Sequence, residues 1–320
     1  MGVLATVVIC TRNRSSLLGE VGRAVLDQKL TRGDWELLIV DNASTDDTAH
    51  IARSTVDVAP DRARLVVEDE VGLSAARNRG FREARGEVVV FLDDDAFPEQ
   101  GWLERLVEVL AAPDRPMCAG GPVHPLFQGA LPPWFRARFL PYLTVWDLGP
   151  EPVDLRYNEY PRGANVAYRR EVYERYGGFC THLGRKGKSL LSCEEIELCL
   201  RIERDGRSIV YVPDAAVRHV IVADRITPRW LERRFAAQGA SEAIVNWQHG
   251  GWKAVRTGLG AYRRNARQAA SQRRWVGVEY ARCQLRAHRG YLWGIPHAVL
   301  RTRRYRPKAG VRAADWAPFS

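Results

Sequence analysis

The feature that most constrains this chain is a regular alternation of short apolar segments and amphipathic segments over its first 92 residues. The run from Thr6 to Cys10 has the continuous apolar character of a strand that is buried on both faces. The elements that follow are predicted as strands at 35–40, 64–67 and 87–92 and as helices at 17–28, after Ser44 or Thr45, and at 73–84. Strand–helix–strand units of this kind need parallel crossovers. We therefore predict an α/β fold with a doubly wound, mostly parallel sheet.

Polar residues gather directly after three of the predicted strands, at 11–14, 41–46 and 93–95. In open α/β sheets, ligands bind in the crevice outside the carboxyl ends of the strands. These three segments therefore predict one binding site at that edge of the sheet.

Three consecutive carboxylates, Asp93, Asp94 and Asp95, follow the apolar strand at 87–92. Like charges so close together repel, so a positive partner is expected. Mg²⁺ and Mn²⁺ are suitable partners because Mg²⁺ prefers oxygen ligands and is usually held by one or two carboxylates plus phosphates. The triplet therefore predicts a divalent-metal site, with a solvated acidic turn or a helix N-cap as the alternative.

Several segments resemble family 2 glycosyltransferases of the GT-A fold, the nucleotide-diphospho-sugar transferase fold. Asp93-Asp94-Asp95 is similar to the D-x-D signature of that family. The other similar segments, in the order of the family, are 11–14, 40–46, 72–80, 162–165, 177–179 and 194–198. The resemblance covers about residues 4–222 and rests on the motifs taken together.

The resemblance implies an enzyme that moves a sugar from a nucleotide-diphosphate sugar to an acceptor hydroxyl. It implies a divalent metal, Mg²⁺ or Mn²⁺, inversion at the anomeric carbon, and a role in making a cell-surface polysaccharide or glycoconjugate. A UDP-sugar is the first donor to expect, with dTDP- and GDP-sugars as alternatives. The implied acceptor is a glycan or a lipid-linked molecule.

The resemblance also assigns roles by position. Thr11, Asp41 and Arg77 would bind the nucleoside, with Asp41 reading the base. Asp93 would face the ribose and the sugar, and Asp95 would hold the metal that bridges the two phosphates. The expected nucleotide-sugar contacts are Thr11, Asn13, Arg14, Asp41, Arg77, Asp93 and Asp94, and the expected metal ligands are Asp95, Asp93 and, as a further candidate, His219.

A general base is expected in the pair Glu194-Glu195, where the family usually has Glu-Asp. We assign the base to Glu195 and an orienting role to Glu194. The alternative is that these acidic residues only favour a helix N-terminus through its dipole. For His219, the alternative to metal binding is a structural role, since a lone histidine is more often structural.

Two positions depart from the family pattern. Asn42 stands where a second aspartate is often found, and Arg12 where an aromatic residue is common. Both departures are expected to affect nucleotide preference. The first strand is not followed by G-x-G-x-x-G, which disfavours a dehydrogenase.

The charge is unevenly placed. Residues 253–308 hold fifteen Lys or Arg against one acid, Glu279, which is a net charge of +14 in a chain of +10. We divide the chain into a catalytic domain, 1–225, and a basic, mainly helical region, 226–320. The basic region is expected to contact a membrane surface or a lipid-linked acceptor, to pack on the catalytic domain, or to bind nucleic acid, the last being least favoured.

No run of apolar residues is long enough to span a membrane, and the start of the chain lacks the pattern of a signal peptide. The six cysteines are scattered. We therefore expect a cytoplasmic protein, peripheral on the inner membrane face if the basic region binds lipid. The alternative function is a non-catalytic protein of the same fold that binds membrane or nucleic acid through that region.

Overall fold

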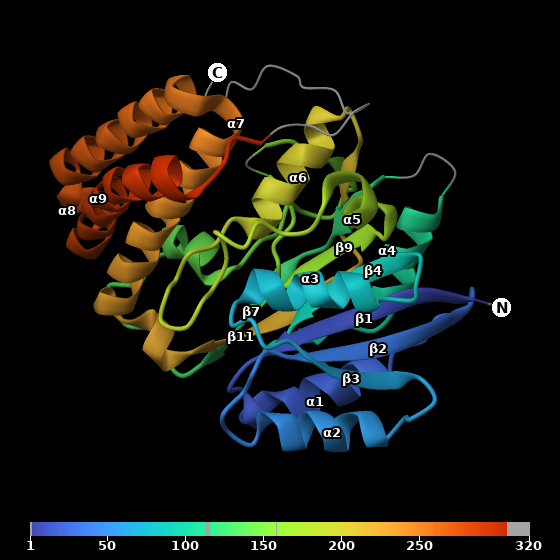
Figure 1. Ribbon diagram of the computed structural model, residues 1–320. Helices are drawn as coiled ribbons and strands as arrows, with labels where there is room; N and C mark the ends of the chain where they lie inside the picture. Colours follow the sequence, from blue (N-terminus) through green and yellow to red (C-terminus); the bar gives the residue numbers. More distant parts are fainter. Residues whose placement is uncertain (1, 113–115, 158, 306–320) are drawn as a thin grey trace.

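The computed structural model describes residues 2–112, 116–157 and 159–305 (Figure 1). The first elements are β1 (Val3–Thr11), α1 (Ser15–Leu26), β2 (Asp34–Asp41), α2 (Thr48–Asp57), β3 (Ala63–Val67), α3 (Leu73–Glu83) and β4 (Val88–Asp93). This is the predicted alternation of strands and helices. β1 pairs in parallel with both β2 and β4, and β2 pairs in parallel with β3.

The remaining elements of the α/β part complete two sheets. They are β5 (Ala96–Pro98), α4 (Trp102–Ala111), β6 (Cys118–Gly120), β7 (Val123–Gln128), η1 (Ala137–Leu143), β8 (Val153–Asp154), β9 (Asn165–Arg169), α5 (Glu171–Tyr176), α6 (Glu194–Arg204), β10 (Ile209–Tyr211), β11 (Val217–Val222) and η2 (Ala223–Ile226). The large sheet has the order β3-β2-β1-β4-β9-β6-β10-β8, and the small one β5-β11-β7. β9 runs antiparallel to β4 and β6. The mostly parallel sheet predicted from the sequence is confirmed.

Alternate residues of the central strands pack into two cores. Val7 and Ile9 of β1 face a core shared with α1, α2 and α4. Val8 of β1 and Val40 of β2 face the opposite core, shared with α3 and α6. Both faces of the sheet are therefore covered, which is why these strands read as continuous apolar runs.

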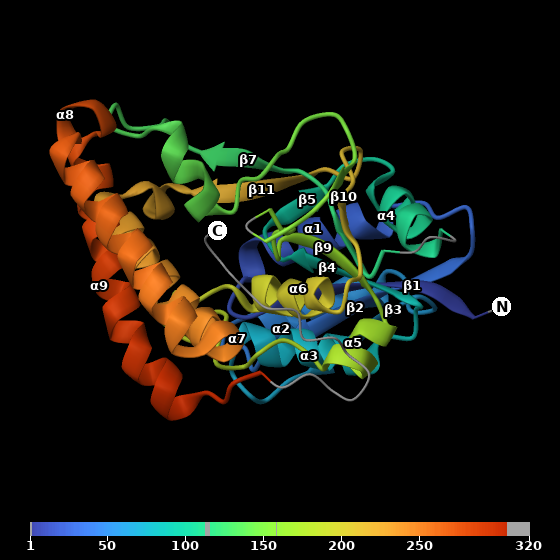
Figure 2. The ribbon, with the colours of Figure 1, turned by 90° about the horizontal axis from the view of Figure 1, so that it is seen from above.

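The C-terminal part is a helical hairpin. Its helices are α7 (Pro228–Ser271), α8 (Arg273–Val276) and α9 (Val278–Arg301), and α7 and α9 run side by side at one end of the molecule (Figure 2). Gly251 interrupts α7 with φ 60° and ψ −149°, a conformation that favours glycine. No helix within the described ranges combines the length and apolar character needed to cross a bilayer.

The aromatic residues of the irregular segment after β7 pack on this hairpin. The Tyr142 and Phe235 rings stack with their centroids 3.5 Å apart, and Phe139 contacts both Phe235 and Tyr280. This aromatic cluster joins η1, α7 and α9 into a third core.

One helix begins later than predicted. α2 starts at Thr48, because Ser44 and Thr45 take part in the turn that follows β2. Ser44 bonds to the Asp41 carboxylate, and the Thr45 amide donates to Asn13 Oδ1 at 2.8 Å. Asp46 Oδ1 accepts from the Thr48 amide at 3.0 Å and so satisfies a donor of the first helical turn.

Candidate active site

A cavity of about 330 Å³ lies at the carboxyl ends of β1 and β4. Its walls come from distant parts of the chain: the ends of these strands, the start of α3, the segment 185–192, the start of α6, β11, η2 and α7. The predicted position of the binding site at this edge of the sheet agrees with the cavity.

The three aspartates have different surroundings within it. Asp93 is partly exposed and accepts a hydrogen bond from Arg77 at 3.1 Å. Asp94 is buried and accepts one from Thr11 Oγ1 at 2.7 Å. Burial and the neighbouring Asp95 raise the pKa of Asp94 to about 7. Because its carboxyl is tied to Thr11 and easily protonated, Asp94 is the least suited of the three to hold a cation.

Asp95 is surrounded by basic side chains. His219 Nε2 lies 3.1 Å from Oδ1, and Arg225 and Arg14 lie 3.1 Å and 3.3 Å from Oδ2. Burial opposes ionisation, yet His219, Arg225 and Arg14 hold the pKa of Asp95 well below its ordinary value. The carboxylate therefore stays ionised in a buried place, as a metal ligand must.

Strand pairing brings His219 to the aspartates. β11 runs antiparallel to β5, with His219 opposite Ala96, the residue after Asp95. Asp93, Asp95 and His219 each offer a ligand atom, and these atoms lie within 4.8 Å of one another. Two carboxylates and an imidazole are a donor set that fits Mn²⁺, and the carboxylates also fit Mg²⁺.

Arg77 of α3 joins the aspartates to the start of α6. Its guanidinium donates to Asp93, to Glu194 Oε1 at 2.7 Å and to the Gly163 carbonyl at 2.9 Å. A Cβ on Gly163 would lie 2.6 Å from Arg77 Nη2, so any larger residue there would displace the guanidinium. Arg77 thus connects three segments similar to the family pattern.

Glu194 and Glu195 begin α6 and line the cavity. Burial and the adjacent Glu195 raise the pKa of Glu194 to about 7, which Arg77 partly offsets. Among the described residues, neither Glu194 Oε2 nor Glu195 Oε2 has a hydrogen-bond partner. Arg77 therefore holds Glu194 through Oε1, and each glutamate keeps one oxygen without a protein partner beside the cavity.

The residues expected to bind the nucleotide fall into two groups. Thr11, Arg14, Arg77, Asp93 and Asp94 line the cavity. Asn13 and Asp41 hold the neighbouring turns instead: Asn13 accepts from Thr45, and Asp41 accepts from Ser44.

The two departures from the family pattern have structural partners. Asn42 donates to the carbonyls of Glu68 and Glu70 and accepts from the Gly72 amide. Arg12 donates to the carbonyls of Asn42 and Ala43. Both also line the cavity, so their polar side chains fasten the loops of its rim.

Three further arginines of the cavity, Arg185, Arg225 and Arg234, were missed by the sequence analysis. Burial, together with repulsion from Arg234 and Arg225, lowers the pKa of Arg185 to about 10. These residues belong to no motif. The only signal for them was the density of Arg in the second half of the chain.

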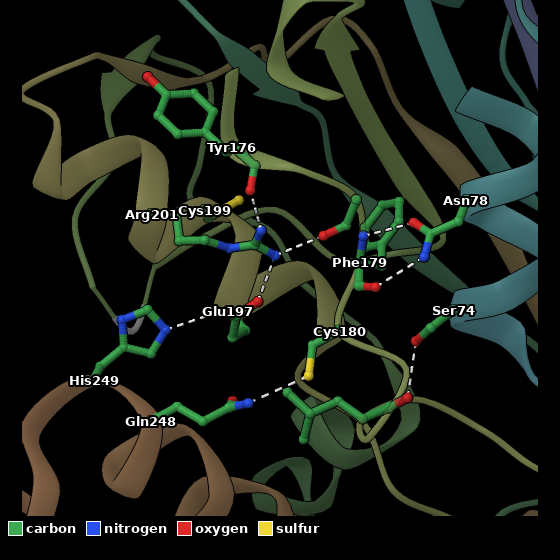
Figure 3. A network of polar contacts seen from close by, with 12 residues as sticks. Ser74, Asn78, Tyr176, Phe179, Cys180, Glu197, Cys199, Arg201, Gln248 and His249 are labelled. Atoms are coloured by element: carbon green, nitrogen blue, oxygen red, sulfur yellow. Dashed lines mark hydrogen bonds and ion pairs between the residues drawn. The ribbon is translucent and has the colours of Figure 1, made fainter. Parts of the chain in front are cut away.

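Other motif residues support the site from behind. Asn78 of α3 bonds to both the backbone amide and the carbonyl of Phe179 at 2.7 and 2.9 Å (Figure 3). A Cβ on Gly178 would lie 2.0 Å from Asn78 Oδ1, which explains the second glycine of Gly177-Gly178-Phe179. The side chain of Asn165 bonds to Trp102 and to the carbonyls of Pro122 and Ala215.

A buried ionic network lies on α6 one turn beyond the two glutamates (Figure 3). Arg201 donates to Glu197 at 2.6 Å and to the carbonyls of Tyr176 and Gly178. His249 of α7 lies 2.8 Å from the other oxygen of Glu197. The network fastens α6 to the loop after α5 and to the C-terminal hairpin.

Comparisons with known proteins agree with this arrangement. The family described as "Glycosyl transferase family 2" matches residues 6–177. The glucosyl-dolichyl phosphate glucuronosyltransferase of Haloferax volcanii is 31% identical over 248 residues, 75% of this chain and 77% of that protein. The O-antigen chain rhamnosyltransferase WbaN of Salmonella anatum is 28% identical over 233 residues, 69% of this chain and 66% of that protein.

Two solved structures share the fold. The mannosyltransferase PcManGT from Pyrobaculum calidifontis, in complex with GDP-Man and Mn²⁺, has a TM-score of 0.61 at 23% identity, covering 92% of this chain and 88% of its own. GalNAc-T7 with UDP, GalNAc and Mn²⁺ has a TM-score of 0.56 at 16% identity, covering 93% and 57%. With its D-x-D aspartates at the end of β4 and a family match over more than half of its length, this chain belongs to glycosyltransferase family 2 and is an enzyme of glycosyl transfer.

Proposed function

We propose that this enzyme transfers a sugar from a nucleotide-diphosphate sugar to an acceptor hydroxyl, in a metal-dependent single displacement that inverts the anomeric carbon. The observation that carries the proposal is the arrangement of one cavity. Asp93, Asp95 and His219 lie together in it, Glu194 and Glu195 also line it, and Arg77 bridges Asp93 and Glu194.

Asp93, Asp95 and His219 are the residues that would hold the metal: the full set suits Mn²⁺, and the two carboxylates also suit Mg²⁺. A bound metal supplies Lewis-acid stabilisation of the charge that develops on the leaving nucleoside diphosphate. The presence of Mn²⁺ in both similar structures favours Mn²⁺ as the first metal to test.

The chain's own residues position the reactants. Thr11, Arg14, Arg77, Asp93 and Asp94 would contact the nucleotide sugar, while Asn13 and Asp41 would shape the turns around it. Glu195 would take the proton of the acceptor hydroxyl. At the same time, the oxygen of that hydroxyl would bond to the anomeric carbon, and the bond from this carbon to the phosphate oxygen would break. Glu194, held by Arg77, would orient this end of α6.

The relatives support the substrate classes. The names of the two curated relatives refer to a lipid phosphate and to an O-antigen chain. From these names we infer that this enzyme takes part in glycoconjugate or cell-surface polysaccharide synthesis and that its acceptor is a glycan or a lipid-linked molecule. A UDP-sugar is the first donor to test, followed by GDP- and dTDP-sugars, since one similar structure holds UDP and the other GDP-Man.

In this proposal, residues 1–225 form the catalytic domain, and the basic region, 226–320, is a separate helical part that supports it. Within that region, residues 253–305 would contact the inner face of a cytoplasmic membrane, while Arg306 and Lys308 lie outside the described residues. The excess of positive charge supports this contact because anionic lipids attract clustered Lys and Arg.

The test is thermal unfolding of the wild type with UDP, GDP and dTDP, each with and without Mn²⁺. A ligand that binds only the folded state raises the melting temperature by mass action. We expect one nucleotide to raise it only with Mn²⁺, and Asp95→Asn to lose that metal-dependent part. Glu195→Gln should keep the shift but release nucleoside diphosphate from the matching nucleotide sugar about 100-fold more slowly, the lower end of general-base contributions.

Glu99→Gln is the matched control, because Glu99 is an exposed acid whose partner, Arg218, lies at 3.7 Å. It should resemble the wild type in both measurements. An Asp95→Asn enzyme with an unchanged metal-dependent shift and an unchanged rate would overturn the proposal.

A further inference from the structure

A second hollow, of about 330 Å³, lies between α7 and α9 beside the active-site cavity. Its surface includes the small residues Ala237 and Ala240 of α7 and Gly290 of α9, with the indole of Trp293 at one side. Trp293 is 68% exposed, which is unusual for so large an apolar side chain. We call this hollow the hairpin groove.

The hairpin groove adjoins the active-site cavity. Ser189 and Leu191 line both hollows. A long molecule that reaches Glu195 from the hairpin side would therefore pass these two residues.

Positive charge lies at the junction and along the groove. Arg234 of α7 is only 9% exposed and lines the active-site cavity, and it sits three residues before Ala237, hence on the same side of the helix. Its Nε and Nη1 groups have no hydrogen-bond partner among the described residues, and its Nη2 donates to the neutral Gln238. A buried guanidinium with unused donors calls for an anionic ligand.

The groove itself adds two arginines, Arg286 and Arg289. Arg286 is paired with Glu232 at 3.0 Å, whereas Arg289 is exposed beside Gly290. The groove thus combines an apolar floor with cationic sides. A neutral glycan would match neither the apolar floor nor the cationic sides. A peptide strand would place its backbone N–H and C=O groups against the apolar floor without hydrogen-bond partners.

We propose that the hairpin groove binds the hydrocarbon chain of a lipid-phosphate acceptor, with Arg234 contacting the phosphate at the junction. The acceptor sugar would then extend past Leu191 towards Glu195. This assignment rests on the proposed function, because it needs the cavity to be the place of transfer. It identifies the acceptor as a glycan joined through phosphate to a single apolar chain.

The test is direct binding of farnesyl phosphate to the full chain by calorimetry, below the concentration at which this probe forms micelles. Farnesol and inorganic phosphate, each lacking one half of the probe, should bind at least about tenfold more weakly, since each loses one of the two contacts. Ala237→Leu, which fills the groove, should weaken farnesyl phosphate and farnesol alike. Arg234→Gln should bring the affinity for farnesyl phosphate down to that for farnesol.

Two matched variants control for folding and for general charge. Ala270→Leu adds the same side chain on an exposed part of α7, and Arg282→Gln removes an arginine of α9 that does not line the groove. Both should bind farnesyl phosphate like the wild type. Equal binding of the probe by Ala237→Leu and the wild type, or inorganic phosphate binding as tightly as the probe, would overturn the proposal.

Nucleotide binding with Mn²⁺ on the same samples separates this inference from the proposed function. If Ala237→Leu keeps the nucleotide-dependent rise in melting temperature but no longer binds farnesyl phosphate, both the proposed function and the groove assignment are supported. If no nucleotide binds while the probe still binds, the proposed function fails and the acceptor role of the groove fails with it. If the nucleotide binds and the probe does not, only the groove assignment fails.

Discussion

At the scale of single residues, the three neighbouring aspartates have three different environments. Asp94 is bonded to Thr11 and burial raises its pKa to about 7, whereas His219, Arg225 and Arg14 hold the pKa of Asp95 well below its ordinary value. Asp93 remains partly exposed beside Arg77. The first and third aspartates are therefore the ones suited to a metal, and the second is part of the wall.

Glu197 shows how a buried charge is kept in place. Burial alone would raise the pKa of this carboxyl, but Arg201 and His249 lower it from 4.5 to about 2. Burial lowers the pKa of His249 below 6.5, so at pH 7 its ring is neutral and its Nε2–H donates a hydrogen bond to Glu197. Glu197 is thus a structural acid, although it stands two residues from the proposed base.

We expect Glu197→Gln to lower the free energy of unfolding at pH 7 by about 3–5 kcal/mol, because it leaves Arg201 buried without its counter-charge. A lowered carboxyl pKa contributes stability above the unfolded value of 4.5 that is lost as the pH falls towards about 2. The difference between wild type and variant should therefore shrink below pH 4.5. Urea unfolding of both proteins between pH 7 and pH 3 measures this difference in the free energy of unfolding.

The control is Glu108→Gln, which removes a partly exposed surface acid paired with Arg32 and Arg105. Exposed pairs contribute about 0–1 kcal/mol, so this variant should stay close to the wild type throughout. A gap between Glu197→Gln and the wild type that does not change with pH would argue against an ionised Glu197.

At the scale of elements, the crossing of α7 and α9 depends on glycines. A Cβ on Gly290 would lie 1.9 Å from the Ala236 carbonyl oxygen, and one on Gly239 would lie 2.1 Å from that of Ala287. The helices approach so closely that backbone meets backbone. This close approach positions the hairpin groove beside the segment 185–192.

We expect Gly290→Ala to destabilise the protein by about 1–3 kcal/mol, since an added methyl group in a packed contact forces the backbone to shift. Gly260→Ala, on the same hairpin, should instead stabilise it by up to about 1 kcal/mol, because alanine is the better helix former. A Cβ there meets only the flexible tip of Arg264 at 3.5 Å. Thermal unfolding of both variants measures these changes in stability. Equal changes in melting temperature for the two variants would contradict the close helix contact.

At the scale of the whole molecule, the basic C-terminal hairpin is part of the enzyme's structure. Ile244 and Val245 of α7 and Ala298 of α9 belong to the core that also holds α3 and α6. Arg234 of α7 lines the active-site cavity. Removing the hairpin would therefore expose the core, so its surface role is best tested by changing charges alone.

We expect replacement of the exposed Arg263, Arg264 and Arg267 by Gln to weaken binding to vesicles of phosphatidylglycerol and phosphatidylcholine about 100-fold, from about 1 kcal/mol for each arginine near an anionic surface. Sedimentation with vesicles measures the binding, and added salt should weaken the wild type more than the variant. Replacing three exposed arginines of the α/β part, Arg32, Arg82 and Arg105, should have no effect. Equal losses in the two triple variants would rule out a specific membrane-facing hairpin.

The sequence alone determined the parts of this protein that depend on local pattern. Apolar runs and helix periodicity predicted the parallel sheet, the three aspartates after β4 stood out by their charge and position, and the glutamates of α6 were indicated by the resemblance to the family. The prediction of the sheet succeeds because residues of one strand or one helix turn have a fixed spacing, which determines where they point.

Only the tertiary structure decided which distant residues complete the site. His219 reaches Asp95 through the register of β11 on β5, and Arg225 and Arg234 arrive from η2 and from a helix of the hairpin. The structure also shows that Asp41 and Asn13 bond to Ser44 and Thr45 in the turns beside the cavity. Strand register and helix crossing arise from packing between elements, which local sequence pattern does not contain.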